Sequence, residues 1–343
     1  MAAQPAPPKP ARLVAFLGGL LATLLLVGLF AAALVGWTMY GPGPTPNGRG
    51  DTIVSLDSGS GVSEIAGKLK RAGVIRSADS FRLAAKLTGA DRSLRAGEYQ
   101  FKSGASLNSI IQMMKSGAVV RHFVTVPEGR TSAMAVRILM AEPLLTGKVT
   151  TPPEGSLLPE TYEFSRGESR AAVLQRMMDA RDKVLKQLWA TRAQGLPFNT
   201  PDEAINLAAI VEKETRLGEE RPHVAGVYIN RLRAGVPLAA DPTIIYGISG
   251  GEPLGRGIRR SELDSDTPWN SYKHAGLPPG PIANPGRASI AAVLNPLVTK
   301  DLYFVATGKG GHAFAATAAE HDRNVAKWRE FEAAQKAREH PDA

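Results

Sequence analysis

The chain begins with a long run of residues that carries no charge. From Leu13 to Met39 the sequence contains no Asp, Glu, Lys or Arg and consists mostly of Leu, Ala, Val, Phe and Gly. A helix rises about 1.5 Å per residue, so a run of this length can cross a bilayer. The pattern predicts a single transmembrane helix at residues 13–39, between an Ala/Pro-rich tail at 1–12 and a stiff Pro/Gly linker at 40–50.

Residues 51–120 contain short segments of alternating kind, which predict a small α+β unit. Thr52–Leu56 and Gly97–Phe101 have the two-residue alternation of strands. Helical spacing occurs in three places: 62–69, 77–87 and the segment that Ser106 caps. The β-α-α-β order resembles a LysM-like module, a fold often used to bind aminosugar polymers. A structural spacer is the alternative, because no row of aromatic residues for sugar stacking is evident.

Residues 121–335 mix helical and strand patterns and predict a larger mixed α/β domain, followed by a tail at 336–343. The chain as a whole therefore belongs to the α+β class, with one membrane helix. Residues 249–286 are rich in Gly, Pro, Asn and Ser. So long an irregular segment in a compact domain usually carries function.

One helix of the larger domain has a clear beginning. Thr200 can cap it, Pro201 suits the first helical position, and Glu203 can complete a capping box. Its helical pattern continues to about Leu217, just before a glycine. A second helix, opened by Pro222, follows directly.

Composition narrows the possible chemistry. The 343 residues include no cysteine, which excludes disulfides, thiolate metal sites and a cysteine nucleophile. The formal net charge of +9 indicates anionic surroundings such as nucleic acid, phospholipid head groups or anionic wall polymers. Charge spread over the surface without a particular partner explains the same number.

The charges beside the apolar run predict its orientation. Lys9 and Arg12 precede it, and no basic residue follows until Arg49. The short N-terminus is therefore expected in the cytoplasm, and the chain from about Tyr40 onward outside the inner membrane. A cleaved signal peptide is the alternative, but the run is longer than a signal core and a bulky Gly36-Trp-Thr-Met-Tyr40 follows. This topology makes nucleic acid a poor partner unless it is inverted.

Two glutamates stand at the ends of apolar stripes in the helix that begins at Thr200. Glu214 follows Leu207, Ile210 and Val211 on one stripe, and Glu212 follows Ile205, Ala208 and Ala209 on another. A carboxyl among apolar residues holds its proton tightly, which is what a general acid needs near neutral pH. Periodicity does not choose between the two. Either carboxylate can instead pair with a nearby cation: Arg216, Arg221 or Arg231.

Other reaction types lack their motifs. No His-x-x-x-His pair, Ser-x-x-Lys or phosphate-binding Gly-x-x-x-x-Gly-Lys loop occurs. We therefore expect no metal and no cofactor. His312, after a diglycine, either contacts substrate or fills a hairpin. Polar residues near the glutamates suit a sugar-binding groove: Asn230, Asp241, Thr243 and Tyr246.

Several motifs together resemble the endolytic murein transglycosylase (MltG, or YceG-like) family. They are Val126-Pro-Glu-Gly129, Glu154-Gly-x-Leu-x-Pro-x-Thr-Tyr162, Ile210-Val-Glu-Lys-Glu-Thr215, Val227-Tyr-Ile-Asn-Arg-Leu-Arg233, Asp241-Pro-Thr-Ile-Ile-Tyr-Gly247, Gly276-Leu-Pro-Pro-Gly-Pro-Ile-Ala-Asn-Pro-Gly286 and Gly308-Lys-Gly-Gly-His312. The resemblance extends from about residue 50 to 335. One departure is Ala239-Ala240, where the family usually has a longer polar residue such as Gln.

The resemblance implies an enzyme that cuts peptidoglycan glycan strands internally beside the inner membrane and leaves a 1,6-anhydro-muramyl end. It implies partners in the peptidoglycan synthesis machinery, such as penicillin-binding proteins. The family's catalytic glutamate, directly before threonine, falls on Glu214. Six residues are expected to bind substrate or support the site: Glu212, Asn230, Asp241, Thr243, Tyr246 and Asn284.

Two other functions stay open at this point. A hydrolytic muramidase would use two carboxylates, Glu214 and Asp241, on either side of the bond. A non-catalytic scaffold would bind the wall without cutting it. A lytic transglycosylase can work with one carboxyl group, because the sugar's own 6-hydroxyl replaces water as the nucleophile.

Overall fold

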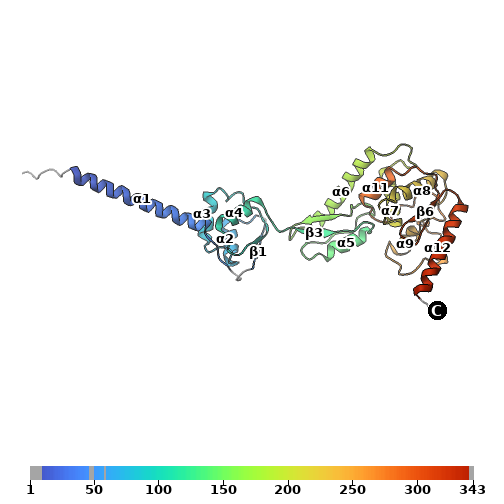
Figure 1. Ribbon diagram of the computed structural model, residues 1–343, viewed down its shortest axis with the longest axis horizontal. Helices are drawn as coiled ribbons and strands as arrows, with labels where there is room; N and C mark the ends of the chain where they lie inside the picture. Colours follow the sequence, from blue (N-terminus) through green and yellow to red (C-terminus); the bar gives the residue numbers. More distant parts are fainter. Residues whose placement is uncertain (1–9, 46–49, 58, 340–343) are drawn as a thin grey trace, which may run out of the picture. The chain divides into compact units, whose positions relative to one another are not determined.

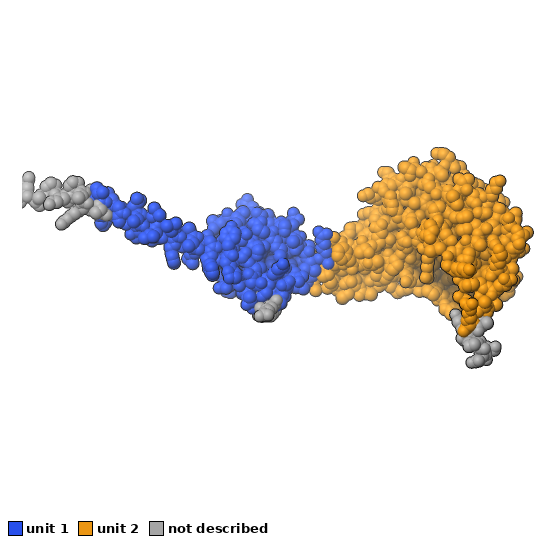
Figure 2. Space-filling model, in the orientation of Figure 1, with its two compact units in different colours: residues 1–121 blue, residues 122–343 orange. Residues whose placement is uncertain are grey.

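The computed structural model describes residues 10–45, 50–57 and 59–339. The chain divides into two compact units, Met1–Arg121 and His122–Ala343, which are coloured separately in Figure 2. Helices and short antiparallel strand pairs make up both, so the predicted α+β class is confirmed. Parts of the predicted tails, 1–9 and 340–343, lie outside the described residues.

Unit 1 begins with helix α1, Pro10–Tyr40 (Figure 1). Its segment Phe16–Tyr40 is long and apolar enough to cross a membrane, and no residue of its most apolar part is buried by the described residues. The large apolar side chains along this segment are exposed, as Leu24 and Phe30 illustrate. A hydrocarbon environment removes the cost of that exposure, which fits a membrane anchor.

The rest of unit 1 is a small module around one strand pair. Strand β1, Thr52–Leu56, pairs antiparallel with β2, Gly97–Phe101. Three helices cover the pair: α2 (Val62–Arg71), α3 (Ala78–Leu87) and α4 (Leu107–Ser116). Tyr99 and Phe81 are fully buried at the centre of its core. The β-α-α-β order is as expected, while the likeness to a LysM module stays a prediction.

Unit 2 begins with a second strand pair, β3 (His122–Thr125) against β4 (Thr161–Phe164). Helix α5, Ser132–Ala141, lies between these strands in sequence, and the long helix α6, Arg170–Ala190, follows them. Both helices contribute buried side chains to one apolar cluster with the strands.

The larger core of unit 2 surrounds helix α7, Pro201–Glu214, which lies among the other helices in Figure 1. The predicted capping box at Thr200 is present, and every residue from Ala204 to Val211 is buried. Helices α8 (Arg221–Ala234), α9 (Asp241–Ser249) and α11 (Arg287–Leu294) contact it. A helix buried on all sides is held in one position by its neighbours, which makes it a firm support for a site at its end.

The chain ends in a hairpin and a helix. Strand β5, Tyr303–Ala306, pairs with β6, His312–Ala315, and helix α12, Ala318–Glu339, contacts both. The apolar run Asp301-Leu-Tyr-Phe-Val-Ala306 of the sequence predicts a buried strand, but the residues of β5 are only half-buried or exposed. The hairpin lies at the margin of the larger core, where Phe304 and Phe314 pack against the buried cluster and stay partly exposed.

Two further features of the helices differ from the sequence prediction: where α7 ends, and the presence of α9. Helix α7 was expected to reach about Leu217, yet it ends at Glu214, because Thr215 turns to extended backbone. Helix α9 was not predicted at all. The irregular segment after it contains one short helix, α10 (Arg260–Leu263).

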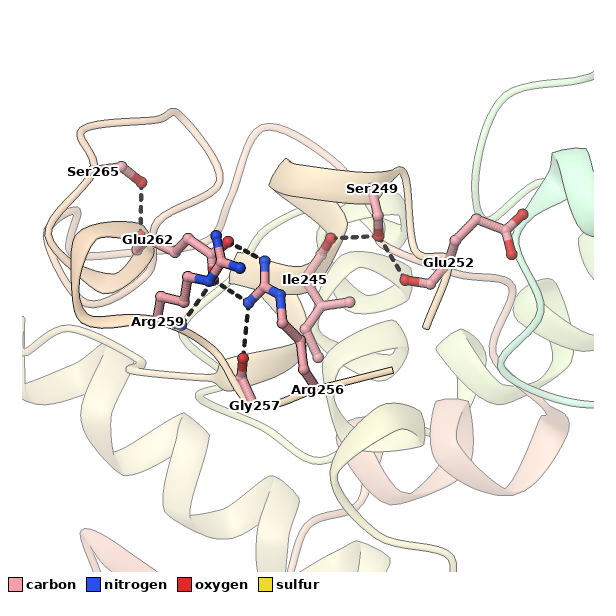
Figure 3. Close-up of polar contacts among 8 residues, drawn as sticks. All are labelled: Ile245, Ser249, Glu252, Arg256, Gly257, Arg259, Glu262 and Ser265. Atoms are coloured by element: carbon pink, nitrogen blue, oxygen red, sulfur yellow. Dashed lines mark hydrogen bonds and ion pairs between the residues drawn. The ribbon is translucent and has the colours of Figure 1, made fainter. Parts of the chain in front are cut away.

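The segment between α9 and α10 is ordered by its own polar contacts (Figure 3). Arg256 donates hydrogen bonds to both carboxylate oxygens of Glu262 and to the carbonyl of Gly257. Ser249 Oγ donates to the carbonyls of Ile245 and Glu252. The loop therefore has a defined shape beside the core rather than a random path.

Candidate active site

Glu214, the last residue of α7, faces a small polar cavity of about 180 Å³. The helix ends there, so the side chain projects beyond the packed helices while the backbone behind it stays fixed. Residues from four other segments complete the wall: Tyr228, Arg231, Leu238, Ala239, Asp241, Tyr272 and Phe304. Of the residues selected from the sequence, the structure brings Glu214 and Asp241 to this cavity.

The environment of Glu214 keeps its proton available near neutral pH. Burial raises the pKa of this carboxyl to about 7, and the nearby negative charge of Asp241 acts in the same direction. Tyr228, whose hydroxyl donates a hydrogen bond of 2.7 Å to Glu214 Oε1, and the Arg231 charge both lower the pKa. Burial outweighs them, so the group can be an acid in one step and a base in the next.

Two tyrosines stand beside the carboxyl groups. Tyr228 is buried, and burial together with the Glu214 charge raises the pKa of its phenol well above the usual value. Tyr272 donates a hydrogen bond of 2.6 Å to Asp241 Oδ1, and burial and this bond raise the pKa of Tyr272. Both phenols are therefore neutral donors, each fixing one carboxylate oxygen.

Arg231 supplies positive charge from a fixed position. Its Nε donates to the Leu302 carbonyl at 2.6 Å, and its Nη1 donates to the carbonyls of Pro237 and Leu238. The ring of Tyr303 lies beside the guanidinium, with 5.3 Å between Cζ and the ring centroid. A guanidinium held this way contributes to the field of the cavity without needing to move.

The wall next to Asp241 has unusual backbone. Ala239 has φ of 51°, a left-handed conformation that favours glycine. Ser271 holds it there, because its carbonyl accepts from Ala239 N and its Oγ accepts from Ala240 N. Thr243 Oγ1 lies 2.8 Å from the same Ser271 Oγ. Thr243 is therefore fully buried and shapes the wall from behind.

Glu212 lies on the other side of α7 and does not reach the cavity. Its carboxylate is 5% exposed and forms an ion pair of 3.0 Å with Arg221. Its Oε2 accepts hydrogen bonds from Gly286 N and Ser289 Oγ. These contacts tie α7 to α8 and to the start of α11, which is a structural task.

The other residues selected from the sequence also stabilise the surroundings rather than line the cavity. Asn230 donates to the carbonyls of Thr299 and Asp301. Asn284 is fully buried and accepts from Leu157 N. Tyr246 packs edge-on against Trp269.

A chain of side-chain contacts lies behind Glu214 and ends at Tyr228. Thr215, the next residue, donates through Oγ1 to Glu220, whose carboxylate also accepts from His312 N and lies 2.7 Å from His312 Nδ1. The His312 ring meets Phe304 edge-on, and Phe304 meets Tyr228 edge-on. His312 therefore contacts the site only through other side chains.

A second carboxyl has a similar pKa but a different setting. Burial raises the pKa of Glu154 to about 7, although its Oε1 accepts a hydrogen bond of 2.7 Å from Ser132 N. That bond lies at the start of α5, so Glu154 satisfies a helix N-terminus. Among the described residues, no cluster of His, Cys, Asp and Glu suits a metal ion.

The sequence did not identify four residues of the cavity as functional: Tyr228, Arg231, Tyr272 and Phe304. A tyrosine on the buried face of a helix needs a partner for its hydroxyl, which was a usable signal for Tyr228. Tyr272 and Phe304 come from segments far away in sequence, and no local pattern connects them to Glu214.

Comparison with known proteins gives concordant matches. A family model described as the YceG-like family matches residues 54–327. An endolytic murein transglycosylase of Bacillus subtilis is 30% identical over 309 residues, covering 80% of this chain and 84% of that protein. One of Streptococcus pneumoniae strain D39 is 28% identical over 331 residues, covering 82% of this chain and 59% of that protein. The crystal structure of a YceG-like protein of Listeria monocytogenes matches with a TM-score of 0.50 and 27% identity, over 80% of this chain and 98% of that one.

Proposed function

The chain belongs to the YceG-like family, and we propose that it is an endolytic murein transglycosylase anchored in the membrane by α1, with Glu214 as its catalytic acid and base. One observation carries the assignment of the residue: a carboxyl with a pKa of about 7, fixed by Tyr228 in a polar cavity at the end of a buried helix. The relatives named as endolytic murein transglycosylases carry the assignment of the activity.

In the first step, protonated Glu214 donates its proton to the oxygen that links muramic acid to the next sugar. The bond between that oxygen and C1 of the muramyl residue breaks, and positive charge develops on the ring. The carboxylates of Glu214 and Asp241 both favour this charge, because both line the cavity in which it develops.

In the second step, the 6-hydroxyl of the same muramyl residue attacks C1. Its proton passes to Glu214, which returns the enzyme to its starting state. The new bond closes a 1,6-anhydro ring, and no water is consumed. An internal nucleophile has a high effective concentration, which explains why one carboxyl group can be sufficient.

The position of Asp241 makes a hydrolytic muramidase the second candidate function. It is a second carboxylate on the same cavity, which is the equipment of a glycoside hydrolase. The hydrogen bond that Tyr272 donates to Asp241 favours a role for Asp241 as a fixed carboxylate over a role as the base that activates water. A non-catalytic scaffold remains the third candidate and has no need of a carboxyl with a pKa near neutrality.

Mass spectrometry of glycan strands treated with the full-length protein tests these candidates, with Glu214→Gln alongside. We expect internal fragments with anhydro-muramyl ends, absent in the variant. Reducing ends that have gained water would establish the muramidase, and a folded protein that binds strands without cutting them would establish the scaffold. Retained turnover in Glu214→Gln would contradict the role of Glu214.

The topology and partners are part of the proposal. Lys9 and Arg12 support a cytoplasmic N-terminus, with the chain from about Tyr40 onward outside the cytoplasmic membrane. There the enzyme would act on strands made by penicillin-binding proteins, and residues 51–120 would serve as a LysM-like module beside a catalytic domain at 121–335. A reporter fused to the C-terminus that is active only in the cytoplasm would contradict this orientation.

A further inference from the structure

A second cavity lies in unit 2 between the terminal hairpin and α12, and the proposed mechanism does not use it. Its volume is about 330 Å³, which is within the range of small-ligand sites. Hairpin residues Lys309 and Ala313 line one side. The other side is formed by one stripe of α12, at the spacing i, i+3, i+4, i+7: Asn324, Lys327, Trp328 and Phe331.

The packing around this cavity is tight on one side and open on the other. The turn at Gly308 lies directly on Phe331, since a Cβ added there would overlap the ring. Thr307 N and Thr307 Oγ1 both donate to the Gly311 carbonyl, and Lys309 N donates back to Thr307 Oγ1. Beside Asn324 and Lys327, by contrast, the space between the hairpin and α12 is not filled by side chains.

The charges of the cavity have one sign. No carboxylate belongs to its lining, and neither Lys309 nor Lys327 forms an ion pair with a carboxylate of the described residues. Two ammonium groups around an aromatic floor suit a ligand that has carboxylates at its ends and apolar groups between them.

Strand β5 connects this cavity with the one around Glu214. Phe304 lines the catalytic cavity, and Ala306, about 7 Å further along the strand, lines the second one. A peptide spans about 3.5 Å per residue, so a short peptide attached to a bound sugar can extend across this distance.

We propose that the cavity between the hairpin and α12 binds the carboxylate-bearing peptide attached to muramic acid. This inference rests on the proposed function. The N-acetylated sugar rings are uncharged, so the peptide is the part of the strand that offers carboxylates to Lys309 and Lys327. The site would favour strands that carry peptides over strands that have lost them.

Steady-state kinetics of the full-length protein test this proposal with two substrates: glycan strands with peptides, and the same strands after an amidase has removed them. We expect Lys309→Gln with Lys327→Gln to raise KM for peptide-bearing strands about five- to tenfold, the worth of two partly exposed charge contacts. Neither kcat nor the KM for stripped strands should change, because the lactyl carboxylate that the amidase leaves is attached to the muramyl ring itself and does not extend to the second cavity. The effect should shrink as salt is added, because salt screens exposed charges.

The matched control is Lys183→Gln with Lys300→Gln, which removes the same charge from two exposed positions outside both cavities. Its KM should equal that of the wild type on both substrates. An unchanged KM in the Lys309 and Lys327 variant overturns the proposal, and so does an equal rise on both substrates. If the wild type cuts neither substrate, the proposed function fails instead, so the two failures are distinguishable.

Discussion

The two sides of helix α7 contain glutamates two residues apart that have opposite surroundings. Glu212 meets Arg221, Gly286 N and Ser289, so its negative charge is compensated inside the protein. Glu214 meets one phenol and a neighbouring carboxylate, and burial raises its pKa to about 7. Complete compensation makes a carboxylate structural, whereas incomplete compensation makes its proton available for chemistry.

The comparison also shows where stability is given up for function. The ion pair with Arg221 and the hydrogen bond from Ser289 connect α7 to two other helices through Glu212. The carboxyl at Glu214 prefers to be neutral, so its charged form opposes folding. Changing one glutamate should therefore damage the fold, while changing the other should damage only the reaction. The predictions below test this contrast in order of expected size.

The largest effect is expected on turnover. Glu214→Gln keeps the size of the side chain and removes the transferable proton, so the rate of strand cleavage should fall about a thousandfold or more. Counting anhydro-muramyl ends by mass spectrometry measures it. Glu212→Gln is the matched control, and it should retain most of the activity in its folded fraction. Equal losses in both variants would remove the contrast.

The next largest effect is the loss of stability in Glu212→Gln. The substitution leaves Arg221 buried without its closest charge partner, which should cost about 3 kcal/mol in the free energy of unfolding. Denaturant titration followed by tryptophan fluorescence measures it, since Trp189, Trp269 and Trp328 all lie in unit 2. A loss below 1 kcal/mol would mean that Glu128, which also pairs with Arg221, is sufficient.

Glu214→Gln should have the opposite effect on stability, which grows as pH rises above about 4.5 and is complete above about pH 7. The folded pKa is about 7 and the ordinary value is 4.5, so the contribution of this carboxyl to stability is complete below pH 4.5 and is lost as pH rises to about 7. The neutral Gln does not incur this loss. At pH 8 the variant should be more stable than the wild type, on the order of 2 kcal/mol. Unfolding curves at pH 4 and pH 8 decide it, and the gain should be nearly absent at pH 4.

The smallest effect is expected for Tyr228→Phe. The phenol lowers the pKa of Glu214 by its hydrogen bond, so the variant should have a higher pKa at that carboxyl. Activity falls as pH rises through this pKa, because the first step needs the protonated form, and the falling limb should move to higher pH. We expect kcat to drop about tenfold, as for the loss of one aligned hydrogen bond. A pH profile of kcat with an unmoved limb would show that the phenol has no electrostatic role.

The two units of the protein also differ in net charge. Of the formal net charge of +9, residues 1–121 contribute +8 and residues 122–343 contribute +1. The positive charge therefore belongs to the unit that contains the membrane helix, where anionic head groups favour basic residues. The catalytic unit is nearly neutral, with cationic places such as Arg231 and Lys309 at particular sites.

Local patterns in the sequence determined much of this protein. The apolar run of α1, the capping box at Thr200 and the stripes of α7 follow from chain chemistry that acts within a few residues. The motifs around Glu214 were sufficient to indicate the family. All of these signals depend on residues close together in the chain, which a sequence displays directly.

Helical periodicity left the choice between the two glutamates open, the family resemblance favoured Glu214, and the tertiary structure gives the physical reason for the difference. Glu212 and Glu214 end equivalent stripes, and the difference between them comes from Arg221, Ser289, Tyr228 and Asp241, which other segments bring to α7. The helix also stopped at Glu214 instead of Leu217, because Thr215 found a partner in Glu220 and left the helical conformation. Packing sets the surroundings of a side chain, and the surroundings set its proton affinity, so the chemistry of this site became readable only once the distant segments were in place.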